Sequence, residues 1–517
     1  MIELVVRGGR TIETGGSGSS RLSAPVDVGI AGGRIVALGE EVDAPDAAVL
    51  DAAGCVLAPG LVNGHTHSHE LLHRGRSRKL PLEVWMHGPR PPFPIQPLSA
   101  EEVYTRTIVA GLEQLRGGAT TIVDDVAFPG LDRTCIEAAF RAYDDLGARA
   151  YVGVSLLNRP YARAMPFADE ELPASLGTTP PATTDARGAA SRPADDLCAT
   201  SPAATDDLLG LVRDLLGARS DSRVRFIVAP SAPQRCSDRL LVEAVGLARE
   251  AGAPAIMHVH ETRLQAVTGQ RWYGATMIEH LHELGVLGPG LSLIHGVWLT
   301  PRDVDLLAAS NTTVQHNPVS NLRLGSGLAP VRAMLDAGVN VSLGTDGCGS
   351  CVTASTIDGV RQAALLHALR GDDPSTWVDA GEALTMATTA AARALLRDDL
   401  GRLEVGCRAD LLCVRLDGPS FVPLNDPLRQ LVHGAAAARI DTVVVDGRPV
   451  LAGGRVLTVD EPAALEAARE LHRERAPELD RLDALVAGIQ PAYLRIHHRC
   501  LAEPISPETY SARLSER

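Results

Sequence analysis

Two histidines, His65 and His67, directly follow the apolar run from Cys55 to Gly64. Side chains alternate along a β-strand, so residues i and i+2 point the same way. Two imidazoles on one side of a strand end can each give a nitrogen to the same metal ion. A single His-x-His pair is equally compatible with two surface histidines. The pair therefore predicts a metal site only if other polar residues join it.

Three further polar clusters each end an apolar, strand-like run. They are His258-Val-His260-Glu261, Leu293-Ile-His295-Gly296 and Gly344-Thr-Asp346-Gly347. Imidazoles and a carboxylate suit a divalent ion that keeps one position for water and lowers the pKa of that water. Glu261, three residues beyond His258, is placed to move the proton. His295 and Asp346 are placed to orient the water and stabilise charge on the substrate. The four clusters together predict an enzyme site.

The elements that carry these clusters alternate between strand-like and helical stretches, which is typical of βα units and a parallel sheet. Eight such units close into an α/β fold, the (β/α)8 TIM barrel, with its active site at the C-terminal strand ends. All four clusters fall at that end. The eight predicted strands are 55–62, 120–124, 150–155, 225–230, 255–258, 291–295, 312–315 and 340–344.

Short strands with Gly-containing turns occupy residues 1–54 and return at 402–457. We expect these two segments to form one small, discontinuous β-sandwich domain built from both termini. The barrel then spans residues 55–401 as the metal-dependent hydrolase domain.

Two segments depart from this pattern. Residues 168–206 lack periodicity and predict a flexible insertion in the third βα loop, either a tolerated surface insertion or a lid. Residues 458–517 predict a helix to about residue 488 and a solvated tail, whose His497-His498 we do not expect to be ligands.

Charge and composition narrow the function class. A net charge of −14 disfavours nucleic acid as a partner, since phosphate binding needs clustered Lys and Arg. The sequence has no run of 18 apolar residues and no signal-peptide pattern, so we expect no membrane partner and a cytoplasmic location. The nine cysteines fit free thiols in a reducing compartment.

Longer motifs resemble the amidohydrolase superfamily over residues 1 to about 457. Within it, the chain is similar to the cytosine deaminase-like and triazine hydrolase-like branch, which includes guanine deaminases and S-adenosylhomocysteine/methylthioadenosine deaminases. The motifs are Pro59-Gly-Leu-Val-Asn-Gly-His-Thr-His67, Met257-His-Val-His-Glu-Thr262, His316-Asn-Pro-Val-Ser-Asn-Leu-Arg-Leu-Gly-Ser-Gly327, Leu343-Gly-Thr-Asp-Gly347 and Gly401-Arg-Leu-Glu-Val-Gly-Cys-Arg-Ala-Asp410.

The resemblance implies a role for each residue of the clusters. The implied metal ligands are His65, His67, His258 and Asp346. Glu261 matches the proton shuttle, and His295 matches the histidine near the hydrolytic water and the substrate.

The resemblance also bears on the number of metal ions. Other branches bridge two metals with a carboxylated lysine after strand four. The only lysine of this chain is Lys79, just past strand one, so a single divalent ion is expected. Imidazole and carboxylate ligands suit Zn²⁺ and also Fe²⁺.

Signals for the substrate are weaker. Glu83 and Trp85 resemble residues that contact the nucleoside in adenosine-type deaminases, although Ser231 stands where that subgroup has a histidine. Trp85 could stack on a flat ring, and a packed helix start is the alternative. Further candidates for the substrate pocket, each with a packing role as its alternative, are Gln234, Arg235, His260, Trp272 and Asn321. We expect Cys348-Gly-Ser-Cys351 to line the pocket, since no thioredoxin-like context surrounds it.

The sequence thus predicts a metal-dependent hydrolytic deaminase that acts on an aminated nitrogen heterocycle of the purine, pterin, pyrimidine or triazine type. The nearest alternative expels chloride or alkylamine from a triazine, or opens a cyclic amide, at the same site. A non-catalytic binding protein on the same scaffold is a more distant alternative. The resemblance further implies a homodimer or a higher homo-oligomer.

Overall fold

The structure is a computed structural model that describes residues 1–15, 19–127, 132–174, 176, 183–184, 190–193, 202–220, 222–434, 436–510 and 512. The 168–206 segment therefore lies partly outside the described residues, and its predicted flexibility stays a prediction. Within it, the structure has α4 (Ala168–Glu171), β12 (Thr183–Thr184) and β13 (Ala190–Pro193). β13 pairs with β9 (Pro94–Ile95).

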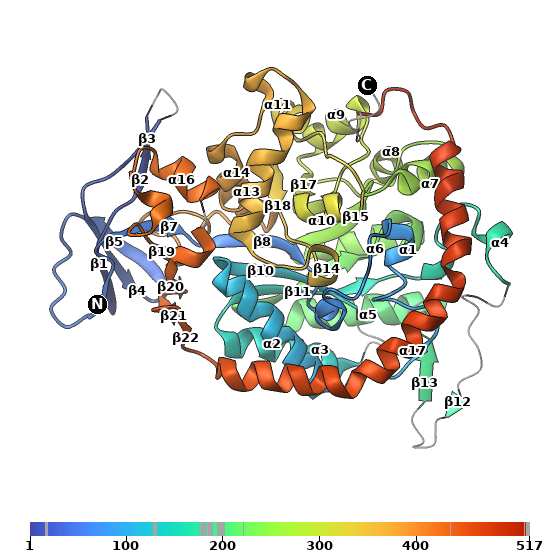
Figure 1. Ribbon diagram of the computed structural model, residues 1–517, viewed down its shortest axis with the longest axis horizontal. Helices are drawn as coiled ribbons and strands as arrows, with labels where there is room; N and C mark the ends of the chain where they lie inside the picture. Colours follow the sequence, from blue (N-terminus) through green and yellow to red (C-terminus); the bar gives the residue numbers. More distant parts are fainter. Residues whose placement is uncertain are drawn as a thin grey trace.

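An eight-stranded parallel sheet forms the centre of the molecule and confirms the predicted barrel (Figure 1). Each of these strands is buried over most of its length because helices cover the outside of the sheet and its inner side chains fill the interior. In sheet order the strands are β8 (Leu61–Thr66), β10 (Ala119–Val126), β11 (Arg149–Leu156), β14 (Val224–Pro230), β15 (Ala255–Val259), β16 (Leu291–His295), β17 (Thr313–His316) and β18 (Val341–Leu343).

The first and last strands meet through the residues that follow them. The backbone N–H groups of Thr345 and Asp346, just past β18, donate hydrogen bonds to the carbonyl of His65 in β8, at 3.1 and 3.0 Å. The amide of Asn63 adds to this junction, since its Oδ1 accepts from the Thr345 N–H at 3.0 Å. The chain thus closes the barrel at the end where the polar clusters lie.

Helices surround the barrel and connect its strands. α2 begins in a capping box, in which Ser99 and Glu102 bond each other's backbone N–H groups. α3 buries Ile136, Phe140 and Tyr143 along one face, as an amphipathic covering helix should. The larger helices are α2 (Ala100–Arg116), α3 (Arg133–Leu146), α5 (Pro202–Ala218), α6 (Asp238–Glu250), α7 (Arg263–Tyr273), α8 (Met277–Glu283), α9 (Pro301–Ser310), α13 (Thr356–Leu366) and α14 (Ala380–Met386).

Shorter helices complete the connections. They are α1 (Leu82–Trp85), α10 (Pro318–Arg323), α11 (Val331–Asp336), α12 (Cys348–Cys351), α15 (Thr389–Ala394), α16 (Pro427–His433) and the 3₁₀ helix η1 (Ser68–His73). No helix among the described residues is both long and apolar enough to cross a membrane.

The predicted first barrel strand, 55–62, is two strands and not one. β7 (Cys55–Pro59) pairs antiparallel with β19 (Leu411–Arg415), and only β8 belongs to the barrel. The break falls at Gly60, whose N–H donates to the Asp410 carbonyl at 2.9 Å. A Cβ at Gly60 would stand 2.2 Å from the Thr120 Oγ1, so only glycine fits this crossing between the sheets.

Strands from both ends of the chain pack together beside the barrel. One sheet has the order β5-β4-β1-β6 and the other β22-β21-β20-β19-β7. Their shared core includes Val6 and Ile30 from the N-terminal strands and Leu411 and Val444 from the C-terminal ones. The strands are β1 (Leu4–Gly9), β2 (Ile12–Thr14), β3 (Ser20–Leu22), β4 (Val26–Ala31), β5 (Arg34–Gly39), β6 (Ala48–Asp51), β20 (Ile440–Val445), β21 (Arg448–Ala452) and β22 (Arg455–Val456).

The C-terminal helix is longer than predicted. α17 runs from Glu461 to Ala502, passes below α2 and α3, and then turns along the side of the barrel (Figure 1). Pro477 and Pro491 lie inside it, where proline removes a helix hydrogen bond and bends the axis without ending the helix. Tyr493 and Ile496 lie fully buried beyond Pro491, because the apolar face continues there.

The packing of His87 against α17 makes the stability of the fold depend on pH. Its ring lies 3.8 Å from the Tyr493 ring of α17, is fully buried, and burial lowers its pKa to about 3. An unfolded histidine titrates near 6.5, so between about pH 6.5 and 3 the unfolded chain binds a proton that the folded chain excludes. His87 thus contributes stability above pH 6.5 that is lost as the pH falls through this window.

We expect His87→Phe to lose stability less steeply on acidification than the wild type. The slopes of unfolding free energy against pH should differ by up to about 1.4 kcal/mol per pH unit. Urea unfolding at pH 7, 6 and 5 measures the slopes, with the exposed His498→Phe as the matched control. Equal slopes for wild type and His87→Phe would contradict the assignment.

Candidate metal centre and active site

Four predicted ligands from three separate strands meet at the C-terminal end of the barrel. His65 and His67 come from the end of β8, His258 lies in β15, and Asp346 follows β18. Ligand nitrogens of the three histidines all lie within 4.8 Å of one another. Asp346 Oδ1 stands 3.6 Å from His65 Nε2 and 3.5 Å from His67 Nε2. The barrel thus brings together residues that lie up to 281 positions apart.

These spacings fit a divalent ion. Ligand atoms about 2.1 Å from a tetrahedral ion are about 3.4 Å from one another. Neither ring nitrogen of His65 has a hydrogen-bond partner among the described residues, although the ring is fully buried. Buried polar atoms without partners are costly, and coordination to a cation would satisfy this one. The donor set therefore fits the metal that the sequence predicts.

Backbone carbonyls fix which ring nitrogens face the centre. His67 Nδ1 lies 2.6 Å from the Asp125 carbonyl, and His258 Nδ1 lies 2.9 Å from the Ser231 carbonyl. In each ring Nδ1–H donates to the carbonyl, which leaves the Nε2 lone pair directed at the centre. These contacts position the two rings before any ligand binds.

Asp346 is held by its own backbone and by a neighbouring hydroxyl. Ser320 Oγ donates to Asp346 Oδ2 at 2.5 Å, which leaves Oδ1 toward the histidines. Asp346 has a positive φ of 65°, a strained conformation that is common at functional sites. A Cβ at Gly344 would lie 2.8 Å from the His65 Cβ, so a glycine is needed for this close approach.

Burial and neighbouring charges move the pKa values of the ligands in different directions. Burial, together with His67, lowers the pKa of His65. Burial also opposes protonation of His67, but the carboxylates of Asp346 and Glu70 outweigh it and raise the pKa. For Asp346 the penalty of burial is outweighed by the imidazoles of His65, His67 and His295 around it, and its pKa falls well below the usual range. Asp346 is therefore a carboxylate, as a metal ligand must be.

Glu261 and His295 form a second pair at the same cavity. His295 Nε2 lies 3.4 Å from Glu261 Oε2, and its Nδ1 lies 2.9 Å from Asn321 Oδ1. Burial, and then the charge of Asp346, raises the pKa of Glu261 well above its usual value. Burial lowers the pKa of His295 to about 4, so its ring is neutral. A carboxyl group with a raised pKa next to a neutral imidazole is suited to proton transfer near neutral pH.

These groups line one cavity of about 480 Å³, together with Trp85 and Arg235. The predicted metal and catalytic residues His67, His258, Glu261, His295 and Asp346 all face it, and Ser231 does too. Trp85 is thus available to a flat ring.

Several predicted substrate residues lie elsewhere. Asn321 holds His295, and His260 Nε2 accepts the Met277 N–H at 3.1 Å at the start of α8, so both have positioning roles. Gln234 is buried but does not line the cavity, and Trp272 is 39% exposed at a distance from it. A substrate role for Gln234 and Trp272 therefore stays a prediction.

The contact between Glu83 and His497 corrects the prediction of a solvated tail. His497 lies on α17 and not in a solvated tail, and its Nδ1 stands 3.2 Å from Glu83 Oε2. The burial of Glu83 is outweighed by the hydrogen bond and charge of His497, so its pKa is lowered. The carboxylate therefore faces α17, and Glu83 does not line the metal cavity.

The Cys348–Cys351 segment also differs from the prediction. Both thiols are buried in α12 and neither lines the cavity. Burial raises the pKa of Cys348 to about 12 and that of Cys351 well above the usual value. They are thiols that pack between η1 and the loop of Asp346.

The sequence analysis missed Glu70, which is buried beside the ligands. Glu70 Oε2 accepts the N–H groups of Gly349 and Ser350 at 3.1 and 3.2 Å. Burial raises its pKa to about 7. With His67 and Asp346 it forms a second cluster of ligand-type atoms. Its position three residues after His67 was the available signal.

Comparison with known proteins identifies the family. A model of the amidohydrolase family matches residues 56–450. The chain belongs to the amidohydrolase family. Two similar relatives are a 5'-deoxyadenosine deaminase from Methanosarcina mazei, 33% identical over 86% of this chain and 91% of its own, and a 5-methylthioadenosine/S-adenosylhomocysteine deaminase from Desulforudis audaxviator, 34% identical over 86% and 94%.

Two solved amidohydrolase structures with zinc resemble this chain. An adenosine deaminase from Xanthomonas campestris has a TM-score of 0.75 and 28% identity over 93% of this chain and 99% of its own. An atrazine chlorohydrolase from Arthrobacter aurescens has a TM-score of 0.76 and 26% identity over 91% and 100%. The family and its deaminase members make this chain a hydrolase that acts on carbon–nitrogen bonds. The two zinc-containing structures support a divalent metal at the cluster of histidines and Asp346.

The geometry gives a direct test of the ligand set. We expect His258→Asn to weaken binding of a divalent ion at least about hundredfold, because it removes a nitrogen aimed at the centre. The matched control is His260→Asn, two residues away, whose ring faces Met277. Metal content after dialysis measures both variants. Full metal content in His258→Asn, or equal losses in the two variants, would contradict the ligand set.

Proposed function

We propose that this amidohydrolase is a hydrolytic deaminase of an aminated nitrogen heterocycle, with one zinc ion held by His65, His67, His258 and Asp346. The observation that carries the proposal is the Glu261–His295 pair, 3.4 Å apart, which faces the same cavity as the ligand cluster. In that cavity the pKa of Glu261 is raised and the pKa of Asp346 is lowered. Opposite pKa shifts of neighbouring carboxyls commonly separate an acid–base group from a charge-stabilising group.

The reaction follows from what each residue does. A divalent ion at the cluster supplies an activated water near neutral pH. Glu261 takes a proton from the attacking water, whose oxygen forms the new bond to the ring carbon that carries the amino group. Glu261 then gives that proton to the amino nitrogen, the carbon–nitrogen bond breaks, and ammonia leaves.

His295 and Trp85 orient the substrate in this scheme. The neutral His295 ring, held by Asn321, directs Nε2 at the developing oxygen or at a ring nitrogen. Trp85 stacks on the flat heterocycle. Buried polar groups fixed in advance stabilise the transition state without further reorganisation.

The relatives favour an adenine-type ring as the substrate. Both curated relatives named above deaminate adenosine derivatives, and each is similar to this chain over 86% of its length. The adenosine deaminase structure supports the same class.

The contacts of Glu83 support a second candidate reaction at this site, the hydrolysis of a triazine with loss of chloride or alkylamine. Glu83, which resembles a nucleoside contact, is engaged by His497, and Ser231 stands where the adenosine-type subgroup has a histidine. The atrazine chlorohydrolase is also a close structural match. Assaying ammonia, chloride and alkylamine release from matched substrates separates the two candidates.

Glu261→Gln tests the acid–base role. We expect it to keep its metal and to lose about 10²- to 10⁴-fold in kcat for ammonia release, since an amide cannot move the proton. The exposed Glu283→Gln is the matched control and should match the wild type. An active, metal-loaded Glu261→Gln enzyme would overturn this assignment.

A further inference from the structure

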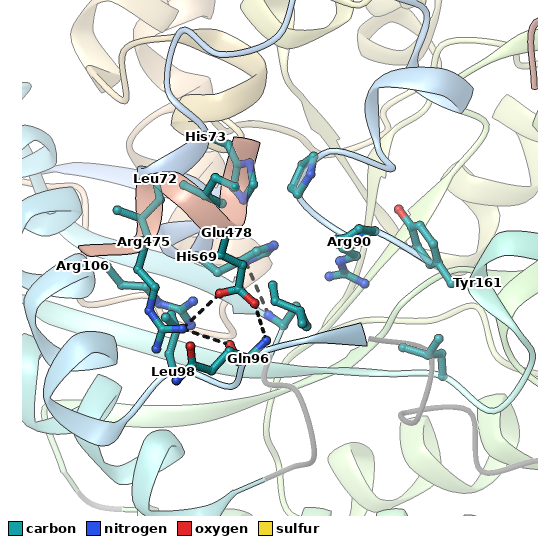
Figure 2. Close-up of a pocket in the computed structure, with 16 residues that line it drawn as sticks. His69, Leu72, His73, Arg90, Gln96, Leu98, Arg106, Tyr161, Arg475 and Glu478 are labelled. Atoms are coloured by element: carbon teal, nitrogen blue, oxygen red, sulfur yellow. Dashed lines mark hydrogen bonds and ion pairs between the residues drawn. The ribbon is translucent and has the colours of Figure 1, made fainter. Parts of the chain in front are cut away.

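A second cavity of about 870 Å³ adjoins the metal cavity (Figure 2). Four residues, His69, Pro89, Arg90 and Tyr161, line both cavities. A ligand that extends along these shared residues would therefore contact both cavities. We call this second cavity the outer chamber.

One wall of the outer chamber comes from α17, which lies beyond the residues that the family model matches. Arg475, Glu478 and Leu479 of α17 line it, and the family model ends at residue 450. The opposite walls come from η1, α2, the segment around β9, and Leu157 after β11. A helix beyond the residues that the family model matches thus closes this space.

The charged side chains of α17 that line the outer chamber form ion pairs and hydrogen bonds that hold the helix in place. Arg475 bonds both carboxylate oxygens of Glu102 at 2.7 Å and Glu478 Oε2 at 3.2 Å. Glu478 Oε1 accepts the Gln96 N–H at 2.6 Å, as the dashed lines in Figure 2 show. These contacts fix α17 against the β9 segment.

The remaining lining of the outer chamber is mostly aliphatic, and its polar members are His69, His73, Arg90, Gln96, Arg106 and Tyr161. Its aliphatic walls include Leu72, Pro91, Ile95, Leu98, Leu157 and Leu479. Arg90 stands at the boundary, where it donates to Ser155 Oγ at 2.9 Å and lies 5.3 Å from the Tyr161 ring centre. An aliphatic lining of this size suits an apolar group.

We propose that the outer chamber receives an apolar substituent, alkyl or aryl, carried by the heterocyclic substrate. The heterocycle occupies the metal cavity and its substituent extends along the wall that the two cavities share, which His69, Pro89, Arg90 and Tyr161 form. This inference rests on the proposed function for the reacting end of the substrate. The inference adds that α17 contributes to substrate specificity, since the chamber it closes limits the size of the apolar substituent.

The test uses adenosine analogues that differ only in the group at the 5' carbon. The series is 5'-deoxyadenosine and its 5'-methylthio, 5'-butylthio and 5'-benzylthio derivatives. In the wild type we expect kcat/KM for ammonia release to rise by up to about fourfold for each added methylene that is buried. No gain along the series would overturn the proposal.

Leu479→Trp fills the chamber from the α17 side. We expect it to lower kcat/KM for the butylthio and benzylthio compounds at least tenfold and to leave 5'-deoxyadenosine within twofold. Ile95→Trp, a half-buried position on the opposite wall, should give the same pattern if Leu479→Trp folds poorly. The matched control is Leu485→Trp, an exposed residue of α17, which should match the wild type throughout. Equal losses for all substrates in Leu479→Trp would overturn the proposal.

A xenon measurement separates failure of this inference from failure of the proposed function. Crystals of the wild type under xenon pressure should hold xenon in the outer chamber, and Leu479→Trp crystals should not, since apolar cavities bind xenon. Xenon binding without any deamination would reject the adenine-type function and retain the apolar chamber. An outer chamber without xenon would reject the chamber whatever the activity.

Discussion

The junction between the first and last barrel strands is the constraint on which the site depends. The carbonyl of His65 accepts the N–H groups of Thr345 and Asp346, and this places a carboxylate against two imidazoles in the interior. The approach requires glycine at 344, since a side chain there would meet His65. Asp346 also adopts a positive φ, which costs on the order of 1–3 kcal/mol. The fold thus maintains a strained, buried cluster that apolar packing elsewhere must stabilise.

Burial in the site leaves the carboxyl groups of Asp346 and Glu261 with opposite pKa shifts. Asp346 lies among imidazoles and stays ionised, whereas burial, and then the charge of Asp346, raises the pKa of Glu261. Asn321 and Ser320, both on α10, reach His295 and Asp346 respectively. One short helix therefore orients both a proposed catalytic histidine and a proposed metal ligand. The difference in environment, not in residue type, separates the two acidic roles.

Much of the fold and of the ligand cluster could be predicted because the signals are local. His65, His67, His258 and Asp346 each lie at or just beyond the end of an apolar strand, and parallel strands bring their ends to one edge of a barrel. The break at Gly60 was missed because the run from Cys55 to Val62 is continuously apolar, and such a run does not show where one sheet ends and the next begins.

The rest depends on contacts between distant parts of the chain. The direction of Glu83 is set by His497, 414 residues away, and nothing near Glu83 in the sequence indicates this. α17 continues beyond the predicted end at about residue 488 because buried Tyr493 and Ile496 extend its apolar face past Pro491. Glu70 was missed because its burial comes from the α12 backbone that covers it. Tertiary packing, not local pattern, decides each of these.

The central claim is that one ion is held by the three histidines and Asp346. Two clusters of ligand atoms share His67, and only one of them includes Glu70. Anomalous X-ray diffraction at the zinc absorption edge from crystals of the metal-loaded protein tests the claim most directly. The account predicts a single peak about 2.0–2.2 Å from ligand atoms of His65, His67, His258 and Asp346. A second peak, or a single peak bonded to Glu70 and not to His258, would contradict it.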